Sequence, residues 1–357
     1  MLMLSLMLAC AGCADQALPV APEQADLHTG TLVTKRLSYA ITDLGILKGG
    51  TLSGATDLNA DGVVVGYADI DDGSYRAFRW EKGSGMMNLG TLGVFPNSRA
   101  NGINRDGTVV GQAYGVDEAR AVAWLPNGAI VDLGHLDAPG HTAATAINDW
   151  GVVVGNSLRD IVPSEHLSIV TTHAFRMLPD GSKIALSANL DQSFAYDINN
   201  SGMIVGAAGP VGSEHAHVWT LAGGATDIGT LGGAWAIAYG ISDNHVVVGV
   251  SETAAAEVHG FRWTAGGGMV DLGLANDNWG AEDVNTFGRI VGNRTGGVMD
   301  GSHGYARLPS GFTFLHGLVP QGDRRARAVN RCGWIAGNAT SSSGTAHAVL
   351  WTKAVCD

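Results

Sequence analysis

The sequence has few charged residues and few prolines. Asp, Glu, Lys and Arg make up 15 % of its 357 residues, whereas soluble domains average roughly 25 %. Hydrophobic residues reach 45 %, so the chain lacks the low hydrophobicity that is typical of a disordered protein. Proline occurs 10 times, and glycine does not recur at every third position, which excludes a collagen triple helix.

Basic residues are scarcer than acidic ones, with 21 Lys and Arg against 33 Asp and Glu and a net charge of −12. A nucleic-acid-binding protein needs a positive surface to displace counterions from phosphates, so we expect no nucleic-acid partner. The sequence contains no motif of a serine hydrolase, a zinc protease or a phosphate-binding loop. We therefore expect no cofactor, and we favour binding over catalysis.

Cysteine occurs four times, and two of the four lie in the apolar N-terminal segment. Residues 1–13 are predicted to be an export signal, and its Cys10 and Cys13 resemble the lipidated cysteine of a bacterial lipobox. A plain signal peptide is the alternative. Residues 14–38 are predicted to be a tether. We expect an exported, membrane-anchored lipoprotein that meets the membrane only through its lipid, or a periplasmic or extracellular protein if no lipid is attached.

Glycine is abundant, at 52 residues, which is about twice its usual share and argues against long helices. Many of these glycines belong to a repeated phrase: Ala, three residues, Asn, two residues, Gly, and an apolar run that ends in Gly. The phrase recurs about every 43 to 51 residues. Its seven anchor positions are Asn59, Asn104, Asn148, Asn199, Ser242, Asn285 and Asn330.

Each repeat has a second half with a basic residue, alternating bulky residues and an Asp-Leu-Gly phrase. His259-Gly260-Phe261 and Asp271-Leu272-Gly273 are one example. Four short β-prone stretches between turn residues predict four strands per repeat. Four-stranded repeats of this length are typical of a β-propeller. The sequence thus predicts an all-β, seven-bladed propeller over residues 39–357, and we expect a monomer.

The last repeat lacks its Asp-Leu-Gly strand, but a spare copy, Asp43-Leu44-Gly45, precedes the first anchor. We predict that this N-terminal strand completes the last blade, so that the ring has no open sheet edge. Cys332 and Cys356 would then lie on one rim of that blade. An exported protein can form a disulfide there, and these two residues are our candidates.

The repeated phrases resemble the HAF-repeat family of bacterial exported proteins. The His-Ala phrase occurs at His173-Ala174-Phe175 and at His347-Ala348. The Asp-Leu-Gly-Thr-Leu-Gly phrase occurs, with Ile in place of the first Leu, at Asp227-Ile228-Gly229-Thr230-Leu231-Gly232. The resemblance covers residues 39–352, with Arg76 and Arg120 in place of the signature His. It implies export and this repeated architecture, and it implies no defined activity.

Most recurring residues have a structural explanation. Asn caps a tight turn and Gly adopts positive φ there, so we assign the anchors to turn formation. Asp57, Asn59 and Asp61 also match the first half of a calcium loop, although Ala68 stands where a bidentate Glu is needed. This calcium site is the alternative. We expect the signature His or Arg to bond a turn or the Asp of the outer strand.

Residues that break the repeat are better candidates for a ligand site. The variable positions just before each anchor phrase are expected on the face that carries the loops between blades. Aromatic rings flanked by polar groups suit a carbohydrate or protein ligand. Our ligand-binding candidates are Asn97, His141, Trp235, Asn278, Trp279, Asp323 and Arg324.

The leading hypothesis is therefore a cell-envelope binding module for a carbohydrate or protein ligand. The alternative is a lyase or hydrolase that acts on an extracellular polymer, with or without a metal ion. Its acid–base candidates would be His141, His166, Glu165 and Glu282. Glu165 and His166 lie in the third repeat, in a predicted loop over residues 156–172 that is longer than its counterparts.

Overall fold

The computed structural model describes residues 39–136, 140–164, 167–186, 192–222, 224–273, 278–295, 301–308 and 311–356, with only the backbone described for 159–164, 167–170, 279 and 295. Residues 34–357 form one compact unit. The predicted signal peptide, the lipidation at Cys10 or Cys13 and the tether lie outside the described residues. Within the described ranges, no helix is long and apolar enough to cross a membrane.

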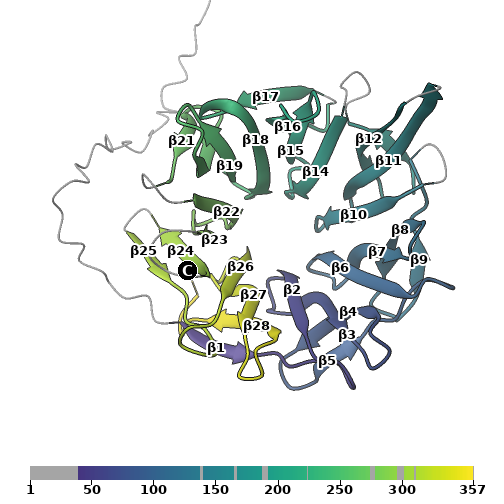
Figure 1. The fold of residues 1–357 in the computed structure, drawn as a ribbon, viewed down its shortest axis with the longest axis vertical. Helices are drawn as coiled ribbons and strands as arrows, with labels where there is room; N and C mark the ends of the chain where they lie inside the picture. Colours follow the sequence, from purple (N-terminus) through teal and green to yellow (C-terminus); the bar gives the residue numbers. More distant parts are fainter. Residues whose placement is uncertain are drawn as a thin grey trace, which may run out of the picture. The chain divides into compact units, whose positions relative to one another are not determined.

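The described residues form antiparallel sheets around a centre, and each blade contributes one inner strand (Figure 1). The inner strands are β2 (Ser53–Leu58), β6 (Asn97–Ile103), β10 (Thr142–Ile147), β14 (Gln192–Ile198), β18 (Gly232–Ile241), β22 (Asn278–Val284) and β26 (Arg324–Val329). The second strands are β3 (Val64–Asp69), β7 (Val109–Tyr114), β11 (Val153–Ser164), β15 (Ile204–Gly209), β19 (Val247–Thr253), β23 (Ile290–Thr295) and β27 (Ile335–Thr340).

Two more strands complete each blade toward the outside. The third strands are β4 (Tyr75–Glu81), β8 (Ala119–Trp124), β12 (Leu167–Met177), β16 (His215–Trp219), β20 (Val258–Thr264), β24 (Ser302–Leu308) and β28 (Ala346–Thr352). The outer strands are β5 (Gly85–Asn88), β9 (Ile130–Asp132), β13 (Lys183–Ala185), β17 (Ala225–Gly229), β21 (Gly268–Asp271), β25 (Gly311–Phe314) and β1 (Ala40–Asp43). Five blades are separate four-stranded sheets, and the last two share a sheet through one parallel bridge between His303 and Arg324.

The N-terminal strand completes the last blade, as predicted. β1 pairs antiparallel with β28, with Ala40 opposite Thr352 and Asp43 opposite Val349. The outer edge of β28 is thereby covered, which removes an unpaired row of backbone groups.

The anchor asparagines join neighbouring blades in addition to shaping their own turns. In the first blade, Asn59 Oδ1 accepts hydrogen bonds from the backbone N–H groups of Asp61 and Val63, and Gly62 has a φ of 80°. Its Nδ2 donates to the carbonyl of Asn104 in the next blade. The same side-chain-to-carbonyl bond is made by Asn104, Asn148, Asn199, Asn285 and Asn330. Ser242 has no amide to donate, and Asn244 Nδ2 bonds Thr286 O at 2.9 Å instead.

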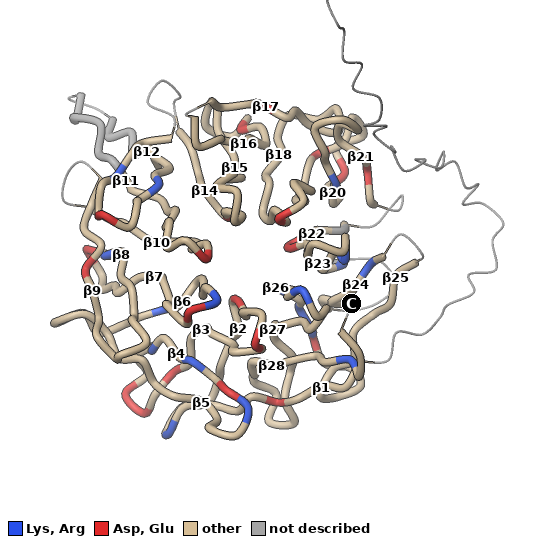
Figure 2. Tube along the Cα trace, turned by 180° about the vertical axis from the view of Figure 1, so that it is seen from behind, with Lys and Arg blue, Asp and Glu red and all other residues tan. Residues whose placement is uncertain are grey.

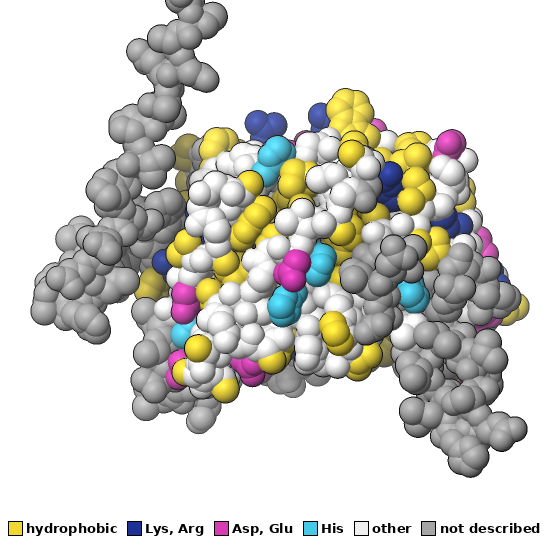
Figure 3. Space-filling model, turned by 90° about the horizontal axis from the view of Figure 1, so that it is seen from above, with side chains coloured by type: hydrophobic (Ala, Val, Ile, Leu, Met, Phe, Trp, Pro, Cys, Tyr) yellow, Lys and Arg dark blue, Asp and Glu magenta, His cyan; other side chains and the backbone are white. Residues whose placement is uncertain are grey.

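The signature His or Arg of the third strand holds the outer strand in four blades. Nδ1 of His215, His259 and His347 lies 2.9, 2.8 and 2.9 Å from an oxygen of Asp227, Asp271 and Asp43, respectively. In the second blade, Arg120 Nη1 is 2.9 Å from Asp132 Oδ2. Figure 3, which views the ring from its edge, shows histidine side chains beside an acidic one. These contacts have the predicted structural role, so the conserved spacing of His and Asp needs no ligand to explain it.

The long loop predicted in the third blade is a β-hairpin. β11 and β12 pair from Val153 opposite Met177 to Ser164 opposite Leu167. The β-branched residues Ile161 and Ile169 face each other in this register, and such residues favour extended backbone. The prediction of a loop over residues 156–172 was therefore wrong, and Glu165 and His166 lie outside the described residues.

Cys332 and Cys356 form a disulfide bond with a sequence separation of 24 residues. It joins the turn before β27 to the chain after β28, in the blade that β1 completes. For a loop of this length, we expect the Cys332→Ser/Cys356→Ser variant to lose about 3 kcal/mol of unfolding free energy. Urea unfolding measures this loss, and a reductant should lower the midpoint of the wild type without affecting the variant. An unchanged midpoint in both cases would contradict the expected contribution.

Candidate functional site

The two ends of the central channel differ in their chain connections. The inner strands begin at one end, together with the connections between second and third strands, and we call this end the loop face. The inner strands finish at the other end in the tight turns that carry the anchors, and we call that end the turn face. The candidates predicted from the sequence belong to the loop face.

On the inner strands, four large side chains of three kinds stand at one repeated position, three residues before the anchor. They are Tyr196, Tyr239, Glu282 and Arg327, on four successive inner strands, and we call them the channel belt. The rings of Tyr196 and Tyr239 meet edge to face with centroids 5.3 Å apart. Arg327 Nη1 is 3.2 Å from Glu282 Oε2. In Figure 2, acidic residues on β22 and basic residues on β26 lie toward the centre.

Glu282, one of the acid–base candidates, is held on both oxygens. Arg327 donates to Oε2, and Asn293 Nδ2 donates to Oε1 at 3.0 Å. Burial raises the pKa of the neighbouring Tyr239 to about 12, and Tyr196 and Glu282 act in the same direction. The Tyr239 hydroxyl therefore keeps its proton at neutral pH and can donate a hydrogen bond. The Glu282 carboxylate accepts the two hydrogen bonds from Asn293 and Arg327.

A second group of side chains lies between the first two blades, and we call it the arginine–tyrosine cluster: Tyr67, Tyr75, Arg99 and Tyr114. The guanidinium carbon of Arg99 lies 4.4 Å from the ring centroid of Tyr67, which is a favourable cation–π distance. The Tyr67 and Tyr75 rings meet edge to face, with centroids 6.0 Å apart. Among the described residues, none accepts a hydrogen bond from Arg99 Nε, which is buried.

The electrostatics of Arg99 are unusual for a protein of net charge −12. Burial lowers the pKa of its guanidinium, and the positive charge of Arg327 acts in the same direction. Arg99 forms no ion pair with a carboxylate in the part of the chain that the structure describes. A partly buried cation without a counterion has a high affinity for an anionic group.

His141 lies in a small cavity of about 290 Å³ between the second and third blades. Gln112, Tyr114 and Asn156 also line this cavity. The amide of Asn156 is committed to the next blade, because it bonds both the N–H and the carbonyl of Ala195. Gln112 occupies the equivalent position of the second blade and has no such bond. Tyr114 belongs both to the lining of this cavity and to the arginine–tyrosine cluster, so the cavity and the cluster are adjacent.

Three other predicted candidates have structural bonds. Asn97 Oδ1 accepts from Tyr75 N at 2.9 Å, and Asp323 Oδ1 accepts from Ser302 N at 2.9 Å. Arg324 is half-buried and its Nη1 donates to Gly322 O at 3.0 Å, whereas its buried Nε has no partner among the described residues. Asn97 and Asp323 therefore position their loops.

The predicted tryptophan platform is only partly described. Trp235 is half-buried on β18, and its carbonyl accepts a hydrogen bond from the Ser251 hydroxyl. Asn278 is exposed at the start of β22. The side chain of Trp279 lies outside the description, so the prediction that the two rings form one platform stays a prediction.

The calcium candidate residues serve the backbone instead. Asp57 is half-buried and accepts hydrogen bonds from the N–H groups of Leu58 at 2.7 Å and Ile103 of the next blade at 2.9 Å. Asn59 Oδ1 accepts from its own turn. Within the described ranges, no three His, Cys, Asp or Glu residues are grouped so that they could hold a metal ion.

Comparison with solved structures supports the propeller architecture. No family model and no curated protein matches the chain. A streptogramin B lyase structure aligns with a TM-score of 0.59 at 9 % identity, covering 88 % of this chain and 98 % of that one. Virginiamycin B lyase from Staphylococcus aureus aligns with a TM-score of 0.54 at 9 % identity, covering 88 % and 99 %.

Puromycin hydrolase aligns with a TM-score of 0.54 at 14 % identity, covering 86 % of this chain and 54 % of that one. At such identities the likeness shows the fold alone. Together with the four-stranded antiparallel sheets and the closing strand, it confirms the prediction from the repeats: the chain is an all-β propeller.

Proposed function

We propose that this propeller is a binding module for a carbohydrate that carries an acidic group, taken up at the loop face. The observation that carries the proposal is Arg99, a partly buried cation that lies against the Tyr67 ring and has no counterion among the described residues. Half-buried tyrosines offer flat faces for the C–H side of a sugar ring and hydroxyls for its oxygens. The guanidinium would take the acidic group.

The neighbouring groups suit a polar ligand of several sugar units. Gln112 and His141 line the cavity that shares Tyr114 with the cluster, and the amide of Gln112 has no partner in the described part of the chain. On the other side lies Arg327 of the channel belt, whose positive charge lowers the pKa of Arg99. A protein ligand that presents acidic side chains is the alternative occupant of this face.

The proposal predicts that Arg99→Gln weakens binding of an acidic oligosaccharide by about tenfold or more, because a hydrogen-bonded ion pair is lost. Isothermal titration with uronate-containing and neutral oligosaccharides of equal length measures the effect. Tyr67→Leu should weaken binding of both kinds. Arg262→Gln, the same change on β20 away from the cluster, is the matched control. Equal binding by the wild type and Arg99→Gln would contradict the proposal.

An enzyme of the same fold is the second candidate, because the similar structures include proteins named as lyases and hydrolases. Glu282, on the inner strand β22, is the acid–base candidate for this alternative. Both of its oxygens accept hydrogen bonds, which favours a binding role over proton abstraction. Turnover of an extracellular polymer that Glu282→Gln abolishes would favour the enzyme instead.

We also propose that the protein is exported and anchored through Cys10 or Cys13, and that it belongs among the HAF-repeat proteins. The Cys332–Cys356 disulfide supports export, because such bonds persist in oxidising compartments. The repeated His-Ala and Asp-Leu-Gly phrases support the family. Mass spectrometry of the mature N-terminus tests the anchor, since lipidation adds acyl chains to one cysteine.

A further inference from the structure

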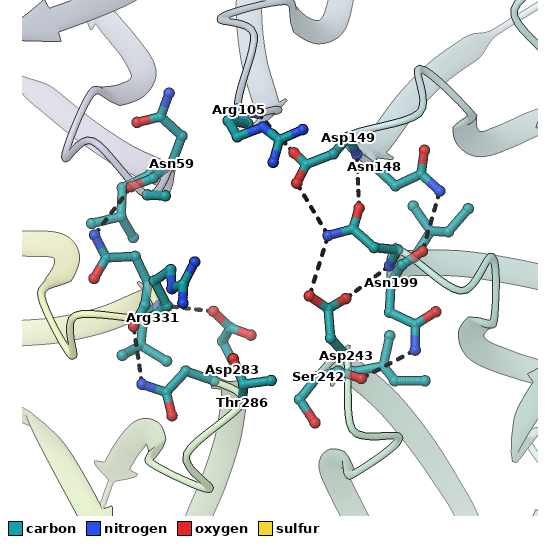
Figure 4. Close-up of a pocket in the computed structure, with 18 of the residues that line it drawn as sticks. Asn59, Arg105, Asn148, Asp149, Asn199, Ser242, Asp243, Asp283, Thr286 and Arg331 are labelled. Carbon is teal, nitrogen blue, oxygen red and sulfur yellow. Dashed lines mark hydrogen bonds between the residues drawn. The ribbon is translucent and has the colours of Figure 1, made fainter. Parts of the chain in front are cut away.

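A larger cavity, of about 460 Å³, opens at the turn face, at the opposite end of the channel from the loop face. It is shown in Figure 4. This volume lies in the range of small-molecule sites, about 300–1,000 Å³. The residues on either side of each anchor line it, so every blade contributes to one closed ring.

A ring of apolar residues surrounds this cavity. The residue before each anchor is Leu, Ile or Val in all seven repeats, and all seven line the cavity: Leu58, Ile103, Ile147, Ile198, Ile241, Val284 and Val329. The anchor side chains above them are committed to turns and to neighbouring blades. Six of these seven side chains are 3–6 % exposed, so the surface that the cavity presents to a ligand is mostly polar, and the carboxylate of Asp283 is part of it.

The mouth of the cavity is formed by the residue after each anchor, which varies between blades. Arg331 and Arg105 come from the blades on either side of the first blade, where the small Ala60 stands. Both arginines are exposed. Neither guanidinium forms an ion pair or a hydrogen bond with any described residue, and Figure 4 shows Arg331 extending into the cavity. Among the described residues, this basic arc therefore has no ion-pair partner.

The opposite side of the mouth is acidic and rigidly built. Asn200 Nδ2 donates to Asp149 Oδ2 at 3.1 Å and to Asp243 Oδ2 at 3.2 Å. The backbone N–H of Asn200 donates to Asp243 Oδ1 at 2.8 Å. The side-chain Oδ1 of Asn200 accepts a hydrogen bond from the backbone N–H of Asp149 at 2.9 Å. A carboxylate has about four acceptor positions, so both can accept further bonds. This acidic arc adjoins the basic arc at one end, where the backbone N–H of Arg105 donates to Asp149 Oδ1 at 2.9 Å, and it lies opposite Arg331 across the mouth (Figure 4).

We infer that the turn-face cavity binds a small zwitterion, namely a short peptide with both termini free. The peptide carboxylate pairs with Arg331 and Arg105, and its ammonium group pairs with Asp149 and Asp243. Two charges of each sign at one mouth select against ligands that carry a single charge.

This site is separate from the carbohydrate site and does not rest on it. No residue of the arginine–tyrosine cluster lines the turn-face cavity. The two proposals are therefore independent: each is tested with different ligands and different variants, so the failure of one does not contradict the other.

The test is isothermal titration of the full chain with leucyl-leucine, N-acetyl-leucyl-leucine and leucyl-leucine amide. The free dipeptide is expected to bind, and each capped form to bind about tenfold more weakly or worse, because each lacks one charge-assisted hydrogen-bonded pair. Capped forms that bind as tightly as the free dipeptide would overturn the proposal. So would the absence of binding by all three up to millimolar concentration.

The Arg331→Gln variant tests whether the dipeptide binds in this cavity or elsewhere on the protein. The variant should bind leucyl-leucine about tenfold more weakly, and the penalty for amidation should shrink in it, because the carboxylate has lost its partner. Arg331 is exposed, so folding should survive, and the thermal midpoint checks this. Arg262→Gln is again the control. Unchanged affinity in a folded Arg331→Gln protein would assign the binding elsewhere and contradict the proposal.

Discussion

A chain that begins at Ile46, and so lacks β1, is expected to lose its cooperative fold at 25 °C. Removal of β1 leaves the edge of β28 unpaired and breaks the bond between His347 and Asp43. It also removes Tyr39 and Leu44, which are 6 % and 5 % exposed in two hydrophobic clusters. Burial of each such side chain contributes about 2 kcal/mol. The total loss approaches the 5–15 kcal/mol that stabilises a typical domain.

Thermal unfolding followed by circular dichroism measures this loss, and size-exclusion chromatography detects aggregation. A chain that begins at Tyr39 is the matched control and should melt as the full chain does. In a second control, residues 39–46 follow Asp357 through a flexible linker, which should restore the melt because β1 can still reach β28. Equal melting of the chains that begin at Tyr39 and Ile46 would show that β1 does not close the ring.

The protein is expected to become less stable as the pH rises from about 4.5 to 8.5. Three half-buried carboxylates on inner strands control this: desolvation raises the pKa of Asp57 to about 7, of Asp197 to about 6 and of Asp283 to about 8. Each carboxylate also accepts a backbone N–H from the next blade, which partly opposes the effect of burial. The burial effect dominates because all three lie inside the ring.

The sign follows from proton binding. In this pH range the unfolded chain has released these protons, whereas the folded chain still holds them, so the unfolding free energy falls with pH. A single group changes it by about 1.4 kcal/mol per pH unit between its unfolded and folded pKa values. For three groups, a fall on the order of a few kcal/mol is expected in urea titrations at a series of pH values.

Asp283→Asn isolates one of these groups. Its amide cannot ionise, so the slope above pH 6 should become shallower by about 1 kcal/mol per pH unit. Burial lowers the pKa values of His135 and His303, which stabilises the folded state as the pH rises, but this contribution is shared by both proteins. Asp106→Asn, on an exposed turn, is the control. Parallel profiles for the wild type and Asp283→Asn would contradict this account.

The architecture could be predicted because it depends on local repetition. The spacing of Asn59 and its six counterparts indicated the turns, and the spare Asp43-Leu44-Gly45 phrase indicated the closing strand. The pairing of His259 with Asp271 could also be inferred, because adjacent strands of one blade place them side by side. In each case the partners lie within one repeat or one repeated phrase.

Contacts between blades could not be predicted in the same way. Asp57 resembled a calcium ligand, yet its carboxylate bonds Ile103 N in the next blade. The contact of Arg99 with Tyr67 joins two strands of different blades. Tyr67 directly follows Gly66 in its second strand, and nothing in the sequence around it predicted this contact. Which side of a blade each residue faces depends on the bulge in the inner strand, as between Ala55 and Asp57, which the sequence does not mark.

The candidate site was therefore only partly foreseen. Glu282 and His141 were singled out, and the structure places one on the inner strand β22 and the other in the small cavity. Asn97 and Asp323 break the repeat because they position loops. The sequence analysis did not single out Tyr67, Arg99 or Tyr114. Each lies in a predicted strand, where an alternating bulky residue is expected for packing, and their proximity appears only when neighbouring blades are placed side by side.

The most direct test of the binding account is a crystal structure of the protein with a uronate-containing oligosaccharide. The account predicts one sugar ring against the tyrosines of the arginine–tyrosine cluster, with a carboxylate oxygen within about 3 Å of an Arg99 nitrogen. An oligosaccharide bound away from this cluster, or a failure to bind any acidic oligosaccharide at millimolar concentration, would contradict it.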